Sequence, residues 1–198
     1  ALCASEVITI SETARLLKVR GEAMQKAVPK GKGAMAALIS SNFDQLENLL
    51  FEVKKYGVCE IANENSNEQI VVSGHYEAVE RLIKIASDFS IKKSIMLNVS
   101  APFHCSLMKP AQDRLRIELE TINFSTPTIP IICNYNASPE TNPLDLKNNI
   151  IEQVINKVRW KETMDLVKEK KAKQIVELGS GRVLSGIAKR MVSEIDCF

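Results

Sequence analysis

The order of strand-like and helix-like segments between residues 34 and 99 limits the possible folds more than any other feature of this sequence. Short apolar runs bounded by turn residues indicate strands, and apolar side chains at three- and four-residue spacing indicate helices. The predicted order is strand 34–39, helix 42–56, strand 58–62, polar turn 63–68, strand 69–73, helix 76–88 and strand 91–99. This βαββαβ order predicts a small ferredoxin-like domain.

The rest of the chain has a different pattern, in which helices and strands alternate. The predicted elements are helix 11–27, helix 111–121, strand 127–133, helices 144–155 and 160–169, strand 173–178 and helix 183–191. Such alternation is typical of an α/β fold with a parallel sheet. A glycine-rich linker at residues 29–33 separates the two patterns. We therefore expect a small domain at residues 31–97, inserted into a large domain made of residues 1–30 and 98–198.

Composition argues against several classes of function. The 198 residues carry a net charge of +2, which gives no electrostatic basis for binding nucleic acid. No apolar run approaches the roughly 18 residues that a membrane span needs. The five cysteines are odd in number and lack a CxxC pair, so we expect free thiols in a reducing compartment, the cytoplasm, rather than disulfides or a bound metal.

Arg20 is a candidate for binding an anion. Ser11 is the expected N-cap of helix 11–27. The helix has one apolar stripe, formed by Ala14, Leu17, Met24 and Val28. Arg20 lies on or beside this stripe, where a charge is costly unless it is paired. It is therefore either an edge residue that extends its charge into solvent or a partner for a small carboxylate.

His104 is the candidate for acid–base chemistry. It is one of two histidines, and it lies in the loop of residues 100–110 between a predicted strand and a predicted helix. Histidine can take a proton and return it near neutral pH, although most histidines are structural or simply exposed. A histidine base needs a nucleophile to activate. Cys105 is adjacent in an extended loop and would point away, and Ser100 and Ser106 lack the G-x-S-x-G signature, so the sequence offers no convincing nucleophile.

A glycine turn between a predicted strand and a predicted helix is a weaker candidate. Gly179-Ser180-Gly181 could offer backbone N–H groups to a phosphate. Two glycines at this spacing more often permit tight packing of the strand against the helix, and we favour that interpretation.

Several segments, taken together and in order, resemble one enzyme family. They are RLLKVRGEAMQ (15–25), GAMAA (33–37), NENS (63–66), SAPFHCSLMKP (100–110), VRW (158–160) and ELGSGRVL (177–184). Over essentially its whole length the chain is similar to the malonyl-CoA:acyl carrier protein transacylases of type II fatty-acid synthesis. The resemblance implies an α/β-hydrolase-like large domain, incomplete here, with an inserted ferredoxin-like small domain.

The resemblance also implies a catalytic arrangement. Family members use a serine in a G-H-S-x-G-E elbow, which opens a helix that continues into a segment like residues 1–4. We therefore expect the nucleophile to lie upstream of Ala1 and this chain alone to be inactive. His104 matches the catalytic base of the family. Gln153 matches the glutamine whose backbone carbonyl orients that histidine in place of an aspartate.

Four further residues match substrate-binding positions of the family. Arg20 corresponds to the clamp for the malonyl carboxylate, and Met24, one turn later, to a residue that lines the pocket. Asn63 corresponds to an active-site asparagine of the small domain. Phe103, just before the histidine, accompanies malonyl rather than bulkier methylmalonyl substrates. Ser180, where proline is frequent, and Asn67-Glu68, where Pro-Gly is common, depart from the pattern at turns only.

The implied reaction is a ping-pong transfer of malonyl from malonyl-CoA to acyl carrier protein through a serine acyl-enzyme, with no resident cofactor and no metal. Its partners are malonyl-CoA and acyl carrier protein, without nucleic acid or membrane. Two alternatives stay open. One is an acyltransferase domain of a polyketide synthase. The other is a non-catalytic ferredoxin-like binding module at residues 31–97, which leaves Arg20 and His104 unexplained.

Overall fold

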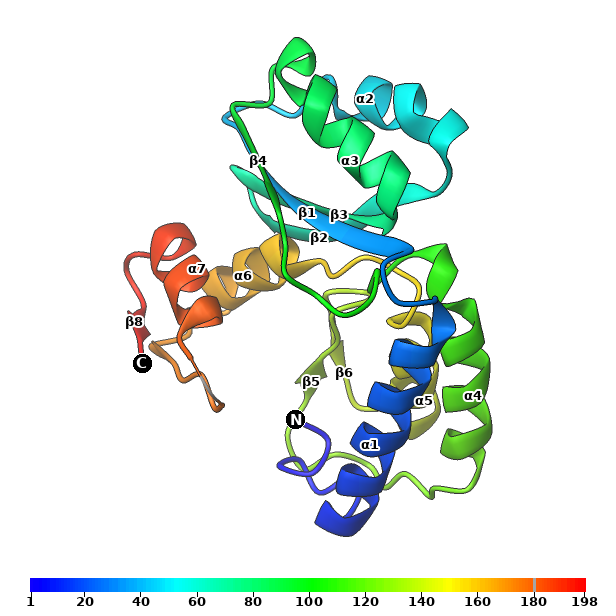
Figure 1. Ribbon diagram of the computed structural model, residues 1–198. Helices are drawn as coiled ribbons and strands as arrows, with labels where there is room; N and C mark the ends of the chain where they lie inside the picture. The colour runs from blue at the N-terminus through cyan, green and yellow to red at the C-terminus, as the bar shows by residue number, and fades with distance from the viewer. Residues whose placement is uncertain (180) are drawn as a thin grey trace.

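In the computed structural model, which describes residues 1–179 and 181–198, strand β1 (Gly33–Ile39) lies inside a four-stranded sheet (Figure 1). β1 pairs with β3 (Gln69–His75) on one side and with β4 (Lys93–Met96) on the other. β2 (Cys59–Ser66) is the outer strand beside β3, and all three pairings are antiparallel. The five middle residues of β1 are buried, because both faces of the sheet are covered.

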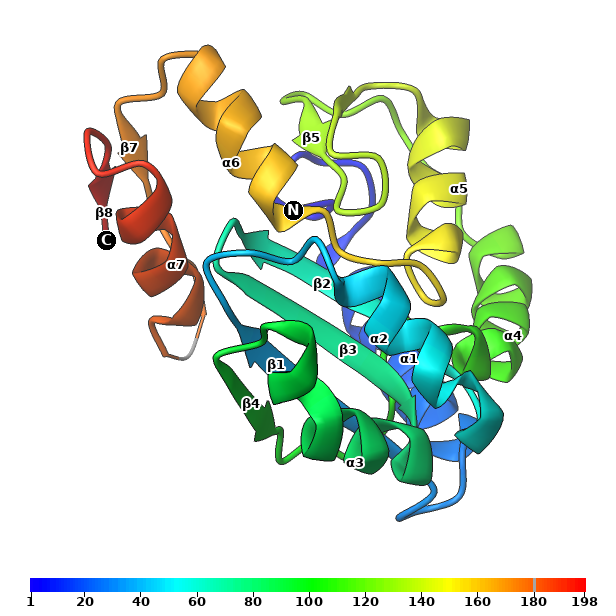
Figure 2. The same ribbon diagram turned by 90° about the horizontal axis from the view of Figure 1, so that it is seen from above.

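Helices α2 (Leu46–Val53) and α3 (Tyr76–Ile85) cover one face of this sheet (Figures 1 and 2). Their buried apolar side chains and those of β1 and β3 form one core cluster, drawn from residues 34–91. The element order is the βαββαβ order that the sequence predicts. We refer to residues 33–96 as the four-stranded unit.

The bounds of β2 and α2 are among those that differ from the sequence prediction. β2 continues through residues 63–66, which the polar composition assigned to a turn, and only residues 67–68 form the turn. Polar side chains are tolerated there because β2 is an outer strand that pairs with β3 along its length. α2 begins later than predicted, because Asn42 instead accepts the backbone N–H of Asp44 at 2.6 Å in a local turn.

The second face of the sheet packs against the rest of the chain. The buried residues of the cluster on this face are Met35, Ala37, Ala62 and Val71. Leu97 and Phe103, which follow β4 in the sequence, pack against this cluster. The four-stranded unit therefore supports the residue immediately before His104.

Helix α1 (Ile10–Ala27) packs along α4 (Lys109–Glu120) below the sheet in Figure 1. The N-cap of α1 is Thr9, so the prediction of Ser11 was wrong. The Thr9 hydroxyl accepts the backbone N–H of Glu12 at 3.2 Å, and the Glu12 carboxylate accepts the backbone N–H of Thr9 at 2.8 Å. This reciprocal capping box satisfies two N–H groups that the first turn leaves free, which is why the helix begins before Ser11.

The buried face of α1 also differs from the predicted stripe. Leu16 and Met24 are buried, whereas Leu17 is 60% exposed. Residues four apart lie on the same side of a helix. Arg20, four residues after Leu16 and four before Met24, therefore lies on the buried face itself rather than beside it.

The remaining elements form two small pairs of strands and three helices. They are β5 (Ile131–Ile132), β6 (Pro139–Glu140), α5 (Pro143–Glu152), α6 (Trp160–Glu169), β7 (Gln174–Ile175), α7 (Val183–Met191) and β8 (Asp196–Cys197). β5 pairs antiparallel with β6, and β7 pairs parallel with β8. The described residues thus form an α/β structure with mixed pairing, and within them the expected continuous parallel sheet is not found. Ser180, in the predicted glycine turn, lies outside the described residues.

Among the described helices, none is long and apolar enough to cross a membrane. The described residues also contain no group of three or more His, Cys, Asp or Glu side chains that could hold a metal ion.

Candidate functional site

The imidazole of His104 is in direct contact with Gln153. His104 follows β4 and precedes α4, whereas Gln153 is the C-cap of α5. The Nδ1 atom of His104 lies 2.9 Å from the backbone carbonyl oxygen of Gln153. A carbonyl oxygen can only accept, so Nδ1 carries the proton and donates it. In the neutral ring the Nε2 atom is then unprotonated and available as a base.

The side chain of Gln153 does not compete for the same proton. Its Nε2 atom lies 3.3 Å from His104 Nδ1, but two N–H donors cannot hydrogen-bond to each other. That amide nitrogen donates instead to the carbonyl oxygen of Asn156 at 3.1 Å. The 3.3 Å approach is therefore a contact, and the bond to the Gln153 carbonyl is the one that fixes the tautomer.

The backbone of His104 is strained. Its φ of 60° lies in the left-handed region, which costs a residue with a Cβ about 1–3 kcal/mol. Interactions on either side of the residue compensate for this cost. The buried Cys105 donates its thiol to the carbonyl oxygen of Pro102 at 3.2 Å. Burial also raises the pKa of Cys105, so this thiol stays protonated and is a poor nucleophile, as its position beside His104 suggested.

The surroundings of His104 favour its neutral form. Burial lowers the pKa of the imidazole, the hydrogen bond to the Gln153 carbonyl raises it, and the nearby charge of Arg20 lowers it again. The pKa lies below its ordinary value of 6.5. At neutral pH most molecules therefore hold His104 as an unprotonated base.

Arg20 lies on the buried face of α1, and burial lowers the pKa of its guanidinium group. It lines a cavity of about 290 Å³. The cavity is bounded by Ala1, Leu2, Arg20, Ile131, Ile132, Cys133, Asn134, Leu146, Asn149, Ile150 and Gln153. The lining is mainly apolar, so the guanidinium is the main charged group facing a bound molecule. A small carboxylate could pair with it through two parallel hydrogen bonds.

The structure places the three other predicted site residues in two different settings. Met24 is 3% exposed, and the half-buried Phe103 packs against the same core cluster. Asn63 lies in β2, where it forms an isolated parallel bridge with Val158. The structure thus brings His104 to Gln153 and Arg20 to the cavity beside Gln153. Met24 lies in the core cluster and Phe103 packs against it, and Asn63 lies in β2 of the four-stranded unit.

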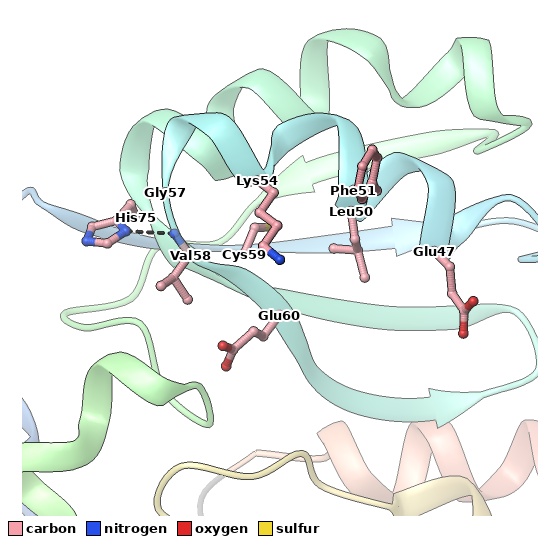
Figure 3. A pocket seen from close by; sticks show the side chains of 9 residues that line it. All are labelled: Glu47, Leu50, Phe51, Lys54, Gly57, Val58, Cys59, Glu60 and His75. Carbon is pink, nitrogen blue, oxygen red and sulfur yellow. Dashed lines mark hydrogen bonds between the residues drawn. The ribbon is translucent and has the colours of Figure 1, made fainter.

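A second cavity, of about 610 Å³, lies between α2 and β2 (Figure 3). It is lined by Glu47, Leu50, Phe51, Lys54, Gly57, Val58, Cys59, Glu60 and His75. None of the residues predicted from the sequence to act on a substrate belongs to it. Its histidine, His75, has a local structural role, because its Nδ1 accepts the backbone N–H of Val58 at 2.9 Å.

Sequence reasoning missed Glu60, which accepts hydrogen bonds from the loop after His104. The carboxylate of Glu60, on β2, accepts the backbone N–H of Ser106 at 2.8 Å and its hydroxyl at 2.7 Å. The only signal in the sequence is an acidic residue inside an otherwise apolar strand, at residues 58–62. That signal does not reveal a partner 46 residues away.

Comparison with known proteins identifies the family. Residues 1–194 match the family model described as the acyl transferase domain. The chain belongs to this acyl transferase family. The malonyl CoA-acyl carrier protein transacylase of Escherichia coli strain K12 is 37% identical over 195 residues, which are 98% of this chain and 63% of that protein. The chain thus spans less than two thirds of the length of this curated relative.

Solved structures of acyl transferases have the same arrangement. An acyl-carrier-protein-S-malonyltransferase from Bartonella henselae has a TM-score of 0.94 and 41% identity, and the match covers 100% of this chain and 63% of that one. A malonyl-transacylase solved in complex with its type II PKS acyl-carrier protein also has a TM-score of 0.94, with 36% identity. That match covers 100% of this chain and 64% of that one.

Proposed function

We propose that the full-length protein transfers a malonyl group from malonyl-CoA to acyl carrier protein through a serine acyl-enzyme, with the serine upstream of residue 1. The observation that carries this proposal is an oriented base, His104, together with a half-buried cation, Arg20. His104 donates Nδ1–H to the Gln153 carbonyl at 2.9 Å, and Arg20 lines the cavity that Gln153 also borders. The names of the curated relatives and of the solved structures support the same reaction.

In the proposed mechanism His104 works in both halves of a ping-pong cycle. Its free Nε2 takes the proton of the serine hydroxyl as that oxygen attacks the malonyl thioester, and the protonated imidazole then gives the proton to the departing coenzyme A thiolate. In the second half His104 takes the proton of the carrier thiol, which attacks the acyl-enzyme, and returns it to the serine oxygen. The Gln153 carbonyl keeps the proton on Nδ1 throughout.

Arg20 is the proposed determinant of substrate selection. Its charge is half-buried and partly desolvated, so an acetyl group would leave it without a partner, whereas a malonyl carboxylate would pair with it. We further propose that Met24 and Phe103 limit the size of the acyl pocket and that Asn63 contributes a polar contact from β2. Coenzyme A enters as part of the substrate, so the proposed reaction needs no resident cofactor or metal.

The finer description of the fold belongs to the same proposal. We infer an α/β-hydrolase-like domain from residues 1–30 and 98–198, with a ferredoxin-like domain inserted at residues 31–97. The sheet order β2-β3-β1-β4 and the two helices on one face support the second part. We also propose that the protein works in the cytoplasm, where free thiols are stable and malonyl-CoA is available to fatty-acid synthesis.

The decisive experiment removes the cation from the full-length enzyme. Arg20→Ala should reduce malonyl transfer by about 10²–10³-fold, because it leaves a buried carboxylate unpaired, and should reduce acetyl transfer far less. Acyl-enzyme formation is followed by intact-mass spectrometry with each acyl-CoA. Arg15→Ala is the matched control, since Arg15 lies on the same helix but is exposed and pairs with Glu118. Equal losses with both acyl groups would contradict the clamp role.

The carrier that receives the malonyl group is a second question. A solved relative at 36% identity is in complex with a type II PKS acyl-carrier protein, which keeps a role in polyketide synthesis open. Transfer rates to a fatty-acid carrier and to a polyketide carrier, measured with the same malonyl-enzyme, distinguish the two. A preference for the fatty-acid carrier supports the proposal as stated.

A further inference from the structure

Glu60 connects the four-stranded unit to the loop that carries His104. Its carboxylate accepts two hydrogen bonds from Ser106, one from the backbone N–H at 2.8 Å and one from the hydroxyl at 2.7 Å. The two donors reach different oxygens, Oε2 and Oε1. Figure 3 shows the Glu60 side chain extending from β2 on the side away from α2. The contact therefore holds the chain two residues after the strained His104.

The same strand also holds the segment that follows Gln153. The backbone N–H of Val158 donates to the carbonyl oxygen of Ala62 at 2.8 Å, and the backbone N–H of Glu64 donates to the carbonyl oxygen of Val158 at 2.9 Å. The side chain of Glu64 pairs with Lys157 at 2.6 Å. β2 is thus hydrogen-bonded to two segments: the loop that carries His104, through Ser106, and the segment that follows Gln153, through Val158.

These contacts differ in kind. The Val158 bonds are made by backbone atoms and would survive most side-chain substitutions. The bond to the His104 loop depends on one side chain, that of Glu60. Without it, the backbone strain at His104 (φ 60°) has less to oppose it, and the loop can relax toward an ordinary conformation. Such a relaxation would rotate the imidazole away from the Gln153 carbonyl.

We propose that Glu60 is a positioning residue for the catalytic base. It fixes the loop after His104 so that Nδ1–H points at the Gln153 carbonyl and Nε2 stays free. The inference rests on the proposed function in one respect, namely that His104 acts as the base. The geometry itself is independent of the substrate, so the position of the imidazole can be tested separately from turnover.

The number of acceptor oxygens explains why a carboxylate suits this position. Ser106 presents two donors, and a carboxylate has one oxygen for each. A glutamine in place of Glu60 has a single acceptor oxygen for the backbone N–H and can meet the Ser106 hydroxyl only by donating to it from the amide, so both contacts lose the strength of a charged acceptor. An alanine keeps neither. The expected order of loop fixation is therefore glutamate, then glutamine, then alanine.

The first test compares rates in the full-length enzyme. Glu60→Ala should slow formation of the malonyl-enzyme by about 10- to 100-fold, the loss typical of a misplaced catalytic group, while the KM for malonyl-CoA changes little. Glu60→Gln should recover part of the rate. Glu68→Ala is the control, since Glu68 lies at the exposed turn of the same β2–β3 hairpin. A Glu60→Ala enzyme that matches the wild type, or a loss seen only in KM, would overturn the inference.

The second test measures the imidazole directly. In the ¹⁵N-histidine-labelled full-length protein, wild-type His104 should be the Nδ1–H tautomer, and Glu60→Ala should shift it toward Nε2–H, the form favoured by a free imidazole. His75 is an internal reference, because its Nδ1 accepts a hydrogen bond and its tautomer should stay Nε2–H in every variant. An unchanged His104 tautomer in Glu60→Ala would overturn the positioning role even if the rate fell.

The two tests separate this inference from the proposed function. If the wild-type protein forms no malonyl adduct, the proposed function fails, and the tautomer measurement still decides whether Glu60 positions His104. Should Glu60→Ala not fold, Ser106→Ala removes only the hydroxyl bond and leaves β2 intact. It should then give a smaller change of rate and tautomer in the same direction, and no change in either would count against the inference.

Discussion

The four-stranded unit and the remainder of the chain obtain their cores in different ways. The unit buries a cluster drawn only from residues 34–91, a continuous stretch of sequence. The main cluster of the remainder joins residues as far apart as Val7 and Val154. Every strand in the unit pairs within it, whereas the other strands are two residues long. The first region is thus specified locally, and the second depends on contacts between distant segments.

The proposed chemistry follows the same division. Arg20, His104 and Gln153 all lie outside the four-stranded unit, on segments that long-range packing brings together. The unit contributes Asn63 and the support that β2 gives to the loop and to the segment after Gln153. We therefore expect changes in the unit to alter mainly stability or positioning, and changes at the three outer residues to alter the reaction.

The two histidines give the largest contrast between the regions. In the full-length protein His104→Ala should slow acylation by about 10²–10⁴-fold, the loss typical of a missing general base. The matched variant is His75→Ala, which changes a residue of the four-stranded unit. It removes the acceptor for the Val58 N–H at a cavity that contains none of the predicted site residues, so acylation should stay near the wild-type rate. Stopped-flow release of coenzyme A measures both. Near-normal acylation by His104→Ala would contradict its role as the base.

Two leucines give a contrast in stability. Leu38, near the end of β1, is fully buried, so Leu38→Ala should lower the free energy of unfolding by about 2–5 kcal/mol, through lost burial and the cavity that remains. Leu17, on α1, is 60% exposed, and Leu17→Ala should change the same quantity by no more than about 0.5 kcal/mol. Urea unfolding of the full-length variants provides the comparison. Similar losses at the two positions would show that Leu17 is buried in the complete protein.

The same comparison explains how much the sequence could predict. The βαββαβ order was correct because periodicity, turns and strand partners all lie within one stretch of chain. Residues 173–178 were predicted as a strand, yet only Gln174 and Ile175 pair, with β8. Residues 91–99 were likewise predicted as a strand, but β4 ends at Met96, and the last backbone bond to β1 is the one from the N–H of Leu97 to the carbonyl oxygen of Met35. An apolar run indicates the tendency to form a strand, but hydrogen bonds to a partner decide its length.

Site residues divide in a similar way. Arg20 and His104 could be named as candidates from the sequence alone, because a charge on an apolar stripe needs a partner and a histidine in a loop can exchange a proton, and their proposed roles came from the resemblance. The role of Gln153 came only from the resemblance to a family, since a backbone carbonyl leaves no trace in side-chain chemistry. Glu60 was missed because its partner, Ser106, is 46 residues away and belongs to the other region. Pair contacts of this kind require the fold.

A smaller expected effect is the electrostatic influence of Arg20 on the pKa of His104. The charge of Arg20 contributes to the lowered pKa of His104, although burial contributes more. Arg20→Met removes the charge and keeps an apolar side chain of similar length, so the pKa of His104 should rise toward 6.5 while burial is retained. An NMR titration of the His104 ring in the full-length protein measures this rise. Arg15→Met, which alters an exposed arginine on the same helix, should leave the pKa unchanged.

The sign of the accompanying change in stability follows from proton binding. Between the lowered pKa of native His104 and its ordinary value of 6.5, the unfolded chain binds more protons than the native state. The contribution of His104 therefore makes the free energy of unfolding fall as the pH drops below 6.5. In Arg20→Met the native pKa is closer to the unfolded value, so this decline should be smaller than in the wild type. A decline that is equally steep, together with an unchanged NMR titration, would show that Arg20 and His104 are electrostatically independent.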